Sequence, residues 1–160
     1  MIKIGDKLPE AAFTLATAET RTPTTTAEVF GGKTVALFAV PGAFTPTCSV
    51  KHLPGYRDNA GALRAKGVDL IACTSVNDAF VLSAWAKDQG LGEDVVMLAD
   101  GNGAFARALG LEQDISKGGM GVRSRRYSML VKDGVVKSLN VEEPGEYKVS
   151  SAEYLLEQIG

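Results

Sequence analysis

The sequence predicts an α/β fold with a mixed sheet flanked by helices. Apolar segments alternate with helical patterns through the first two thirds of the chain, which is typical of parallel strands joined by helices. Two alternating segments, 127–131 and 135–139, then flank Lys132-Asp133-Gly134, a turn sequence that favours an antiparallel hairpin. The chain has 160 residues, 45% hydrophobic and 22% charged, so we expect a single domain over residues 1–160.

The first elements are predicted from a threonine-rich segment and an apolar one. Residues 20–26 are interpreted as a turn that leads into a short helix over 27–30, with Thr25 or Thr26 as its cap. The uninterrupted apolar segment 33–40 predicts a strand buried on both faces.

A helical pattern resumes after Cys48. It predicts a helix over 53–65, broken once at Pro54-Gly55 and ended near Gly67. A second apolar segment, 68–74, follows at once and predicts another buried strand.

The second half of the chain continues the alternation. A helix is predicted from 78 to about 89, with Asn77 or Asp78 as its cap. The remaining elements are a strand over 95–98, a helix over 103–109 that Gly110 ends, and a closing helix over 152–159.

Composition and charge exclude several classes of protein. The net charge of −2 gives no reason to expect a nucleic acid or an acidic membrane as partner. No segment approaches the run of about 18 apolar residues that spans a bilayer. The start, Met-Ile-Lys-Ile-Gly-Asp, has neither an apolar segment nor a cleavage site, so we expect no signal peptide.

The small numbers of cysteine and histidine residues exclude further kinds of site. Two cysteines and one histidine supply neither a disulfide framework nor a four-ligand zinc site, so we expect no metal and no other cofactor. These features together predict a cytoplasmic protein whose thiols are kept reduced between reactions.

The most informative stretch is Pro41-Gly42-Ala43-Phe44-Thr45-Pro46-Thr47-Cys48. It places Cys48 where a buried strand leads into the N-terminus of a helix, and free N–H groups and the helix dipole favour an anion there. Thiolate is the reactive form of cysteine, so Cys48 is a candidate nucleophile. The alternative is a small buried core residue, the commoner role of a free cysteine taken alone.

This stretch resembles the active-site signature of the peroxiredoxins. The longer form PGAFTPTCSVKHLPG resembles the type II, peroxiredoxin-5-like subfamily in particular. The similarity extends along the chain, to residues 4–9, 77–80, 84–86 and 123–128. The resemblance implies a thioredoxin-like α/β fold with a central mixed sheet flanked by helices.

The resemblance also implies an activity. The implied activity is that of a thiol-dependent peroxidase, which reduces hydrogen peroxide and small organic hydroperoxides through a Cys48 sulfenic acid. The implied role is in antioxidant defence and redox homeostasis. Glutathione with glutaredoxin, or thioredoxin, would recycle the enzyme. A homodimer is implied as well, with Phe44, Phe80 and residues 118–121 near its interface.

Three further residues would serve Cys48. The Thr45 hydroxyl can accept a hydrogen bond from the peroxide and donate one toward sulfur, or it can simply cap a helix. Pro41 can shape and shield the pocket wall, or it can only end a strand. The chemistry also needs a fixed positive charge, which the resemblance assigns to Arg126, and the alternative there is an edge charge that discourages aggregation.

Arg123 and Arg125 are the other cationic candidates, and we expect them to be solvated or to pair with carboxylates of the substrate or dimer. His52, four residues after Cys48, is interpreted as structural or modulatory, and Trp85 as core packing. The glycine-rich segment 118–121 lacks the strand and spacing of a phosphate loop, which argues against nucleotide binding.

Cys73, 25 residues after Cys48, has two readings. In some plant and bacterial type II relatives a cysteine at this place is the proposed resolving thiol, yet Ile71-Ala72-Cys73-Thr74 also fits plain strand packing. A disulfide needs Cα atoms within about 7 Å, so the bond would require local unwinding around Cys48. The late loop that holds a resolving cysteine in mammalian relatives is Tyr147-Lys148-Val149-Ser150-Ser151 here, without a thiol.

Two rival functions have their own signatures. A thiol–disulfide oxidoreductase would need a second thiol, usually in Cys-x-x-Cys, and Thr45 occupies the partner position. A peroxide sensor or redox relay, which passes oxidation to a partner protein, could have the same site.

Overall fold

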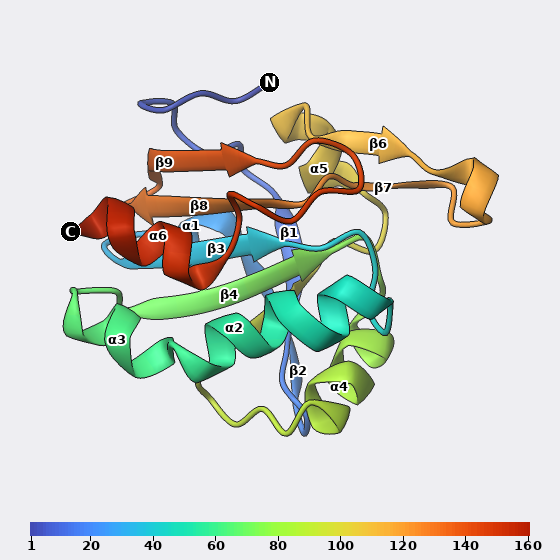
Figure 1. Cartoon of the computed structure of the whole chain (residues 1–160), viewed down its shortest axis with the longest axis horizontal. Helices are drawn as coiled ribbons and strands as arrows, with labels where there is room; N and C mark the ends of the chain where they lie inside the picture. The colour runs from blue at the N-terminus through green and yellow to red at the C-terminus, as the bar shows by residue number, and fades with distance from the viewer.

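A seven-stranded mixed sheet with helices on both faces organises the molecule (Figure 1). The structure, a computed structural model, describes residues 1–160. The strands of this sheet are β1 (Ala12–Ala16), β2 (Arg21–Thr25), β3 (Thr34–Ala39), β4 (Leu70–Ser75), β5 (Val96–Ala99), β8 (Tyr127–Lys132) and β9 (Val135–Val141). The helices are α1 (Thr26–Phe30), α2 (Leu53–Asp58), α3 (Ala60–Ala65), α4 (Ala79–Asp88), α5 (Ala104–Leu109) and α6 (Ala152–Ile159).

The strand order is β2-β1-β5-β4-β3-β8-β9. The three central strands β5, β4 and β3 run parallel, and antiparallel strands extend the sheet on both sides. The mixed α/β sheet predicted from the sequence is therefore confirmed, with the late hairpin beside the first buried strand.

Two hydrophobic layers hold the helices to the sheet. One lies under α2, α3, α4 and α6 and contains Cys48, Cys73 and Trp85; the other lies under α1 and α5. Because β3 has a core on each face, its sequence TVALFA is apolar almost throughout.

The turn between β8 and β9 matches its sequence. Asp133 and Gly134 both adopt positive φ, at 48° and 76°, as a two-residue hairpin turn of type I′ requires. Capping is also as predicted at two helices, because Thr25 accepts from the Glu28 N–H before α1 and Asp78 from the Val81 N–H before α4.

The threonine-rich segment was predicted wrongly. Residues 21–25 form β2, which pairs antiparallel with β1, a strand the sequence analysis did not identify. The threonines are β-branched and favour a strand, and Pro23 is tolerated because β2 lies at the sheet edge, where a missing N–H breaks no ladder.

The predicted helix break was also misplaced. The chain continues through Pro54 because proline is tolerated in the first turn of a helix, and the break falls at Asn59 instead. Residues Cys48–His52 form a π-helical turn in which the Leu53 N–H donates to the Cys48 carbonyl. Turns of this kind are rare and occur often at functional sites.

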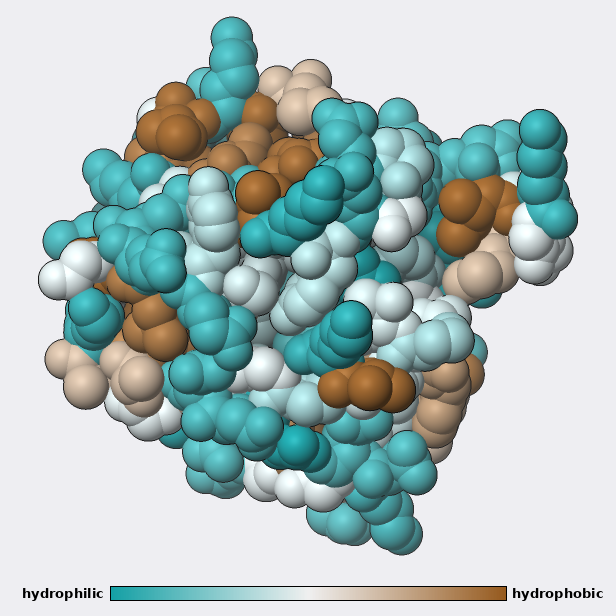
Figure 2. Space-filling view, in the orientation of Figure 1, coloured by the Kyte–Doolittle hydropathy of each residue, from teal (hydrophilic) through white to brown (hydrophobic).

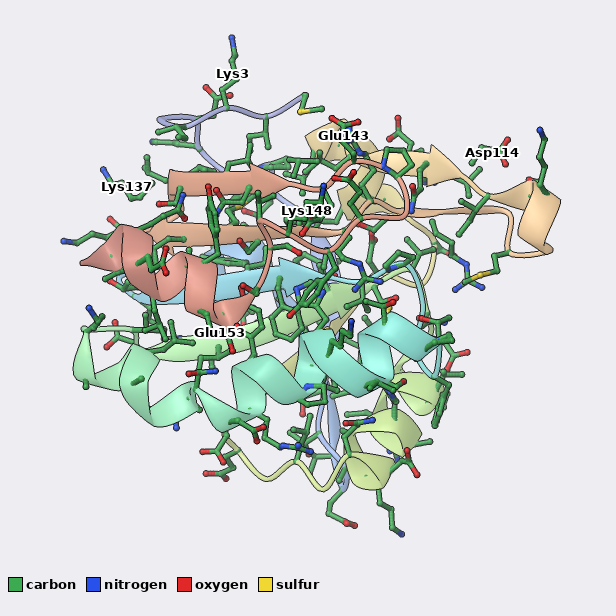
Figure 3. The ribbon with its side chains drawn as sticks, in the orientation of Figure 1. Lys3, Asp114, Lys137, Glu143, Lys148 and Glu153 are labelled. Carbon is green, nitrogen blue, oxygen red and sulfur yellow. The ribbon has the colours of Figure 1, made fainter.

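A short two-stranded arm of β6 (Glu112–Asp114) and β7 (Val122–Ser124) projects from the sheet (Figure 1). A 3-10 turn over Ser116–Gly118 forms its tip, and Figure 3 shows Asp114 on the arm. Apolar side chains are visible on it in Figure 2.

No helix has both the length and the apolar character needed to cross a membrane.

Candidate active site

Strand register brings three distant segments to one edge of the sheet. Ala39 at the end of β3 pairs with Tyr127, and Tyr127 pairs with Val141 on β9. Arg126 therefore lies beside the loop that leaves β3, and the Glu142 N–H donates to the Arg126 carbonyl at 2.9 Å. The loop that leaves β3 carries Cys48, so its thiol and the Arg126 guanidinium come together.

Cys48 is fully buried, and the Arg126 side chain lies on its sulfur. The Arg126 Nη2–H donates to Cys48 Sγ at 3.1 Å. A guanidinium is always ionised, so this contact places a permanent positive charge directly beside the Cys48 sulfur. Of the three arginines considered from the sequence, the one assigned through the resemblance is the one that contacts the sulfur.

The turn before the helix is tight and held from two sides. Phe44 adopts φ of 65°, a strained value for a residue other than glycine. The Thr45 hydroxyl donates to the Gly42 carbonyl at 2.7 Å, and the Ala43 N–H donates to Asn77 Oδ1 at 3.0 Å. In this structure the Thr45 proton is used in the turn and not on the sulfur, while its lone pairs stay free to accept.

Arg123 and Arg125 are half-buried rather than solvated, and both donate to backbone carbonyls of this chain; pairing with carboxylates of a substrate or a second chain stays a prediction. Arg123 reaches the Met120 carbonyl at 2.9 Å and the Pro41 carbonyl at 3.4 Å, and Arg125 the Glu142 carbonyl at 3.0 Å. A carbonyl that faces a guanidinium is satisfied locally, so these arginines brace the loops around the site.

A small cavity of about 110 Å³ opens beside Arg126. Its lining is mostly polar and includes Pro41, and Cys48 and Thr45 are not part of it. The full lining is Pro41, Thr47, Gln113, Arg126, Glu142, Glu143, Pro144, Gly145 and Glu146. Figure 3 places Glu143 on the loop between β9 and α6.

His52 is fully buried between Arg126 and the loop before α6. The Arg126 Nη1–H donates to His52 Nδ1 at 2.8 Å, and the opposite ring nitrogen, Nε2, lies 3.0 Å from the Ser150 carbonyl. Burial, and then the charge of Arg126, lower the pKa of His52 to about 3, although the Ser150 contact acts in the opposite direction. The imidazole is therefore neutral at physiological pH.

Glu142 clasps the loop that follows β9. Its buried Oε2 accepts from the backbone N–H groups of Lys148, Val149 and Ser150 at 2.8–2.9 Å, and from the Ser150 hydroxyl at 2.7 Å. Burial by itself would raise the pKa of Glu142, but these hydrogen bonds outweigh it and hold the pKa below the usual 4.5. The clasp was not predicted, since no spacing rule links residues 142 and 150.

Cys73 is fully buried on β4, in the same hydrophobic layer as Cys48, and no disulfide joins the two. Burial and the neighbouring Cys48 raise the pKa of the Cys73 thiol well above its usual value, against a smaller opposite effect of Arg126. Cys73 is therefore a weak nucleophile in this conformation.

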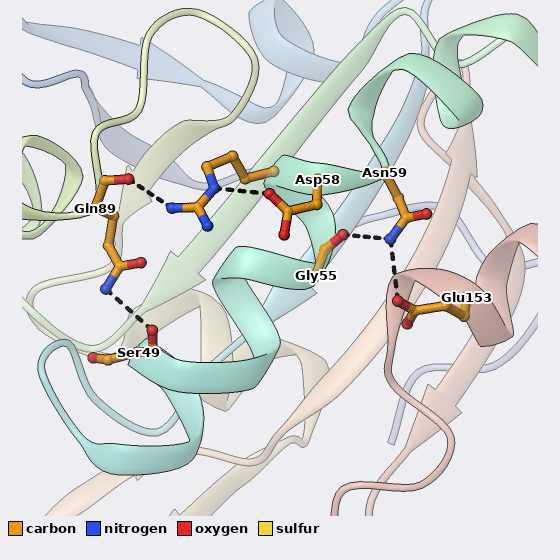
Figure 4. A network of polar contacts seen from close by, with 7 residues as sticks. Ser49, Gly55, Asp58, Asn59, Gln89 and Glu153 are labelled. Atoms are coloured by element: carbon orange, nitrogen blue, oxygen red, sulfur yellow. Dashed lines mark hydrogen bonds and ion pairs between the residues drawn. The ribbon is translucent and has the colours of Figure 1, made fainter.

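The helix that carries Cys48 is tied to α4 and α6. Trp85 is core, as predicted, and its Nε1–H also donates to Ser49 Oγ at 3.0 Å. Figure 4 shows the Gln89 amide on the Ser49 carbonyl and the Asn59 amide bridging Gly55 to Glu153 on α6. These contacts fix the segment on which the thiol lies.

Comparisons with known proteins agree with this geometry. The sequence model of the Redoxin family matches residues 3–156. The chain is 57% identical over 164 residues to peroxiredoxin-2E-2, chloroplastic, of Oryza sativa subsp. japonica, covering 99% of this chain and 72% of that protein. It is 45% identical to peroxiredoxin-2B of Arabidopsis thaliana, covering 99% and 98% of the two chains.

Solved structures give the same result. The crystal structure of reduced Prx3 in complex with H₂O₂ from Vibrio vulnificus superposes with a TM-score of 0.93, at 51% identity over 99% of this chain and 96% of that one. Peroxiredoxin 5 from Alvinella pompejana superposes with a TM-score of 0.87, at 36% identity over 99% and 98%. The fold is thus the thioredoxin-like fold of peroxiredoxins.

A thioredoxin-like sheet with a buried, arginine-bound cysteine after strand β3 defines a redoxin, a class whose chemistry depends on a thiol. Within that class the chain belongs to the peroxiredoxin family, in its type II, peroxiredoxin-5-like branch. Its activity is that of a thiol-dependent peroxidase with an antioxidant role.

Proposed function

We propose that Cys48 is the peroxidatic cysteine and that Arg126 holds the reacting oxygens. The observation that carries this proposal is the Arg126 Nη2 contact with Cys48 Sγ. The thiolate attacks one oxygen of the hydroperoxide; an S–O bond forms, the O–O bond breaks, and the departing oxygen leaves as hydroxide or alkoxide and takes up a proton. Sulfur is oxidised to sulfenic acid, and the peroxide is reduced to water or alcohol.

Pro41 and the burial of Cys48 suit small substrates. Cys48 has no exposed surface, so a bulky hydroperoxide has no room to reach its sulfur in this conformation. Pro41 contributes a wall without an N–H donor, so it shields the site while its carbonyl is engaged by Arg123. These features support the substrate class implied by the sequence.

Thr45 is proposed to accept a hydrogen bond from the peroxide. Because its proton is committed to the Gly42 carbonyl, replacement by valine removes both the acceptor and the lock on the turn. We expect Thr45→Val to lower the second-order rate constant for H₂O₂ by about 30–100-fold. Stopped-flow fluorescence of Trp85 measures this rate, and Thr45→Ser, which keeps the hydroxyl, is the matched control. Equal rates in the valine and serine variants would exclude a role for the hydroxyl.

An external thiol is proposed as the reductant of the sulfenic acid. The sulfenic acid condenses with a thiol to form a disulfide and water, and a second thiol then releases Cys48. Glutathione with glutaredoxin, or thioredoxin, would supply these thiols. Cys73 is the second candidate, since it shares a core layer with Cys48, but its burial and raised pKa disfavour it unless the Cys48 turn unwinds.

The deciding experiment follows the protein after one equivalent of H₂O₂. Wild type and Cys73→Ser are compared by Trp85 fluorescence and intact mass. We expect rapid gain of one oxygen in both proteins, cleared by glutathione. Loss of two hydrogens in wild type alone would assign Cys73 as the resolving thiol. Oxidation no faster than that of free cysteine would refute the peroxidase mechanism, and a trapped mixed disulfide with one partner protein would favour a peroxide sensor.

A homodimer and a cytoplasmic location are further parts of the proposal. Phe80 lies on α4 and is 72% exposed, and Phe44, 52% exposed, lies 6.5 Å from the Trp85 ring of α4. Met120 on the projecting arm lies against Gly42. These apolar groups support an interface beside the active site, to be tested by sedimentation velocity. Two unpaired thiols fit a reducing compartment, to be tested by cell fractionation.

A further inference from the structure

His52 links the Arg126 guanidinium to the loop before α6 through both of its ring nitrogens. Arginine has only donors, so His52 Nδ1, at 2.8 Å from Arg126 Nη1, must accept and carries no proton. The Ser150 carbonyl can only accept, so His52 Nε2, at 3.0 Å, must carry the proton and donate. One neutral tautomer alone satisfies both partners.

The ring is also fixed in place by its surroundings. His52 has no exposed surface, and three aromatic rings pack around it: Phe38 at a centroid distance of 4.9 Å, Tyr56 at 5.7 Å and Tyr147 at 5.2 Å. The titratable or charged groups that face it are Arg126, Tyr56 and Tyr147. The Tyr56 hydroxyl donates to the same Ser150 carbonyl at 3.0 Å, so the acceptor that sets the tautomer is itself held.

The Ser150 carbonyl is positioned by Glu142. Four donors from residues 148–150 converge on Glu142 Oε2, and the Glu142 N–H is bonded to the Arg126 carbonyl. Glu142 therefore bonds the Arg126 backbone directly. It also holds the Ser150 carbonyl that positions His52, the partner of the Arg126 side chain. A shift of the loop would move His52, and with it the guanidinium.

From this geometry we propose that His52 is a positioning residue, held by the Glu142 clasp in its Nε2–H tautomer so that its Nδ1 aims Arg126 at Cys48. The proposal rests on the function proposed above. Arg126 has two Nη groups, and fixing Nη1 on His52 leaves Nη2 directed at the sulfur. Without the Nδ1 acceptor the guanidinium could turn toward Glu142, Glu143 or Glu146 around the cavity.

Two substitutions separate this role from simple core packing. In His52→Asn the amide oxygen lies near the place of Nδ1 and can accept from Arg126, but the side chain is too short for Ser150. In His52→Gln the amide reaches toward Ser150 and leaves the place of Nδ1 empty. We expect His52→Gln to lower the rate constant for H₂O₂ by about 30-fold, because small misplacements of a positioned group cost up to about 100-fold. His52→Asn should recover at least about tenfold of that loss.

The result that would overturn the proposal is an equal loss in both variants, or no loss in either. Glu142→Ala, with exposed Glu157→Ala on α6 as matched control, extends the test. We expect about tenfold slower oxidation in Glu142→Ala alone, through release of the loop. Equal rate constants for H₂O₂ in these two variants would show that Glu142 does not help to position His52.

A measurement without substitution keeps the proposal testable if variants fold poorly. His52 is the one histidine of the chain, so ¹⁵N-histidine labelling gives a single pair of ring nitrogen signals. Wild type at neutral pH should show a protonated Nε2 and an unprotonated Nδ1. A proton on Nδ1 would refute the positioning role whatever the activity. The expected tautomer in a protein that reacts slowly with peroxide would instead refute the proposed function and leave the tautomer assignment standing.

Discussion

Replacing Arg126 with methionine is expected to slow the reaction of Cys48 with hydrogen peroxide by about 10²–10³-fold. Methionine keeps much of the length and apolar volume of the side chain but removes the charge and every donor. In the structure one Nη donates to Cys48 Sγ and the other to His52 Nδ1, so both contacts are lost together. Stopped-flow fluorescence of Trp85, whose indole donates to Ser49 beside Cys48, reports the rate.

The expected size follows from where charge moves in the reaction. Charge develops on the departing oxygen while sulfur loses it, and a half-buried guanidinium that is already oriented stabilises that change without reorganisation. Lysine restores a charge but not the planar fork, so Arg126→Lys should recover only part of the loss.

Arg64→Met is the matched control, because Arg64 lies on α3, pairs with Asp94 and does not contact the sulfur or the loops around it. Its rate should stay within about threefold of wild type, the effect usual for a side chain outside the reacting centre. If Arg126→Met reacts as fast as this control, the guanidinium does not act on the peroxide.

The central part of the fold was predictable because its sequence signals are local. The apolar segments that became β3, β4 and β5, and the Asp133-Gly134 turn, carry their structure in their own residues. Strand β2 was missed because it is a polar edge strand, stabilised by pairing with β1 rather than by burial of its own side chains.

The features of the site also divide into those with a sequence signal and those that only the fold creates. Cys48, Thr45 and Pro41 lie in one stretch of sequence, and the resemblance supplied Arg126 from a distant one. The tautomer of His52 and the Glu142 clasp depend on strand register and on carbonyl groups, which have no residue signature. The direction of the Thr45 hydroxyl likewise depends on the Gly42 carbonyl, which only the folded turn places within reach.

Acid should destabilise the protein through His52, with a sign and pH window set by its pKa. The folded-state pKa of about 3 lies below the unfolded value of 6.5, so the unfolded state binds more protons between these values. The stabilising contribution is complete above about pH 6.5 and is lost as the pH falls toward 3. We expect the free energy of unfolding to drop by about 2–3 kcal/mol between pH 7 and pH 4.5 from this residue.

The window from pH 6.5 to 4.5 isolates His52 from the Glu142 clasp. The pKa of Glu142 is held below 4.5, so its stabilising contribution is present above pH 4.5 and is lost only at lower pH, as its folded-state pKa is passed. Asp100, whose pKa is raised by burial despite hydrogen bonds from Phe105 and Ala106, acts with the opposite sign: its contribution favours the folded state as the pH falls. It is present equally in wild type and variants, so it cancels from their difference.

Urea unfolding of the reduced protein, monitored by Trp85 fluorescence at each pH, measures the free energy of unfolding. Wild type is compared with His52→Asn. The variant has no group that titrates in place of the imidazole, so its stability should change by about 2–3 kcal/mol less than that of wild type over the same window. Parallel curves for the two proteins between pH 7 and pH 4.5 would contradict a buried neutral histidine. Because the folded imidazole stays neutral down to about pH 3, His52 still accepts from Arg126 in the folded protein across this window, so stability should fall before the aim of Arg126 is lost.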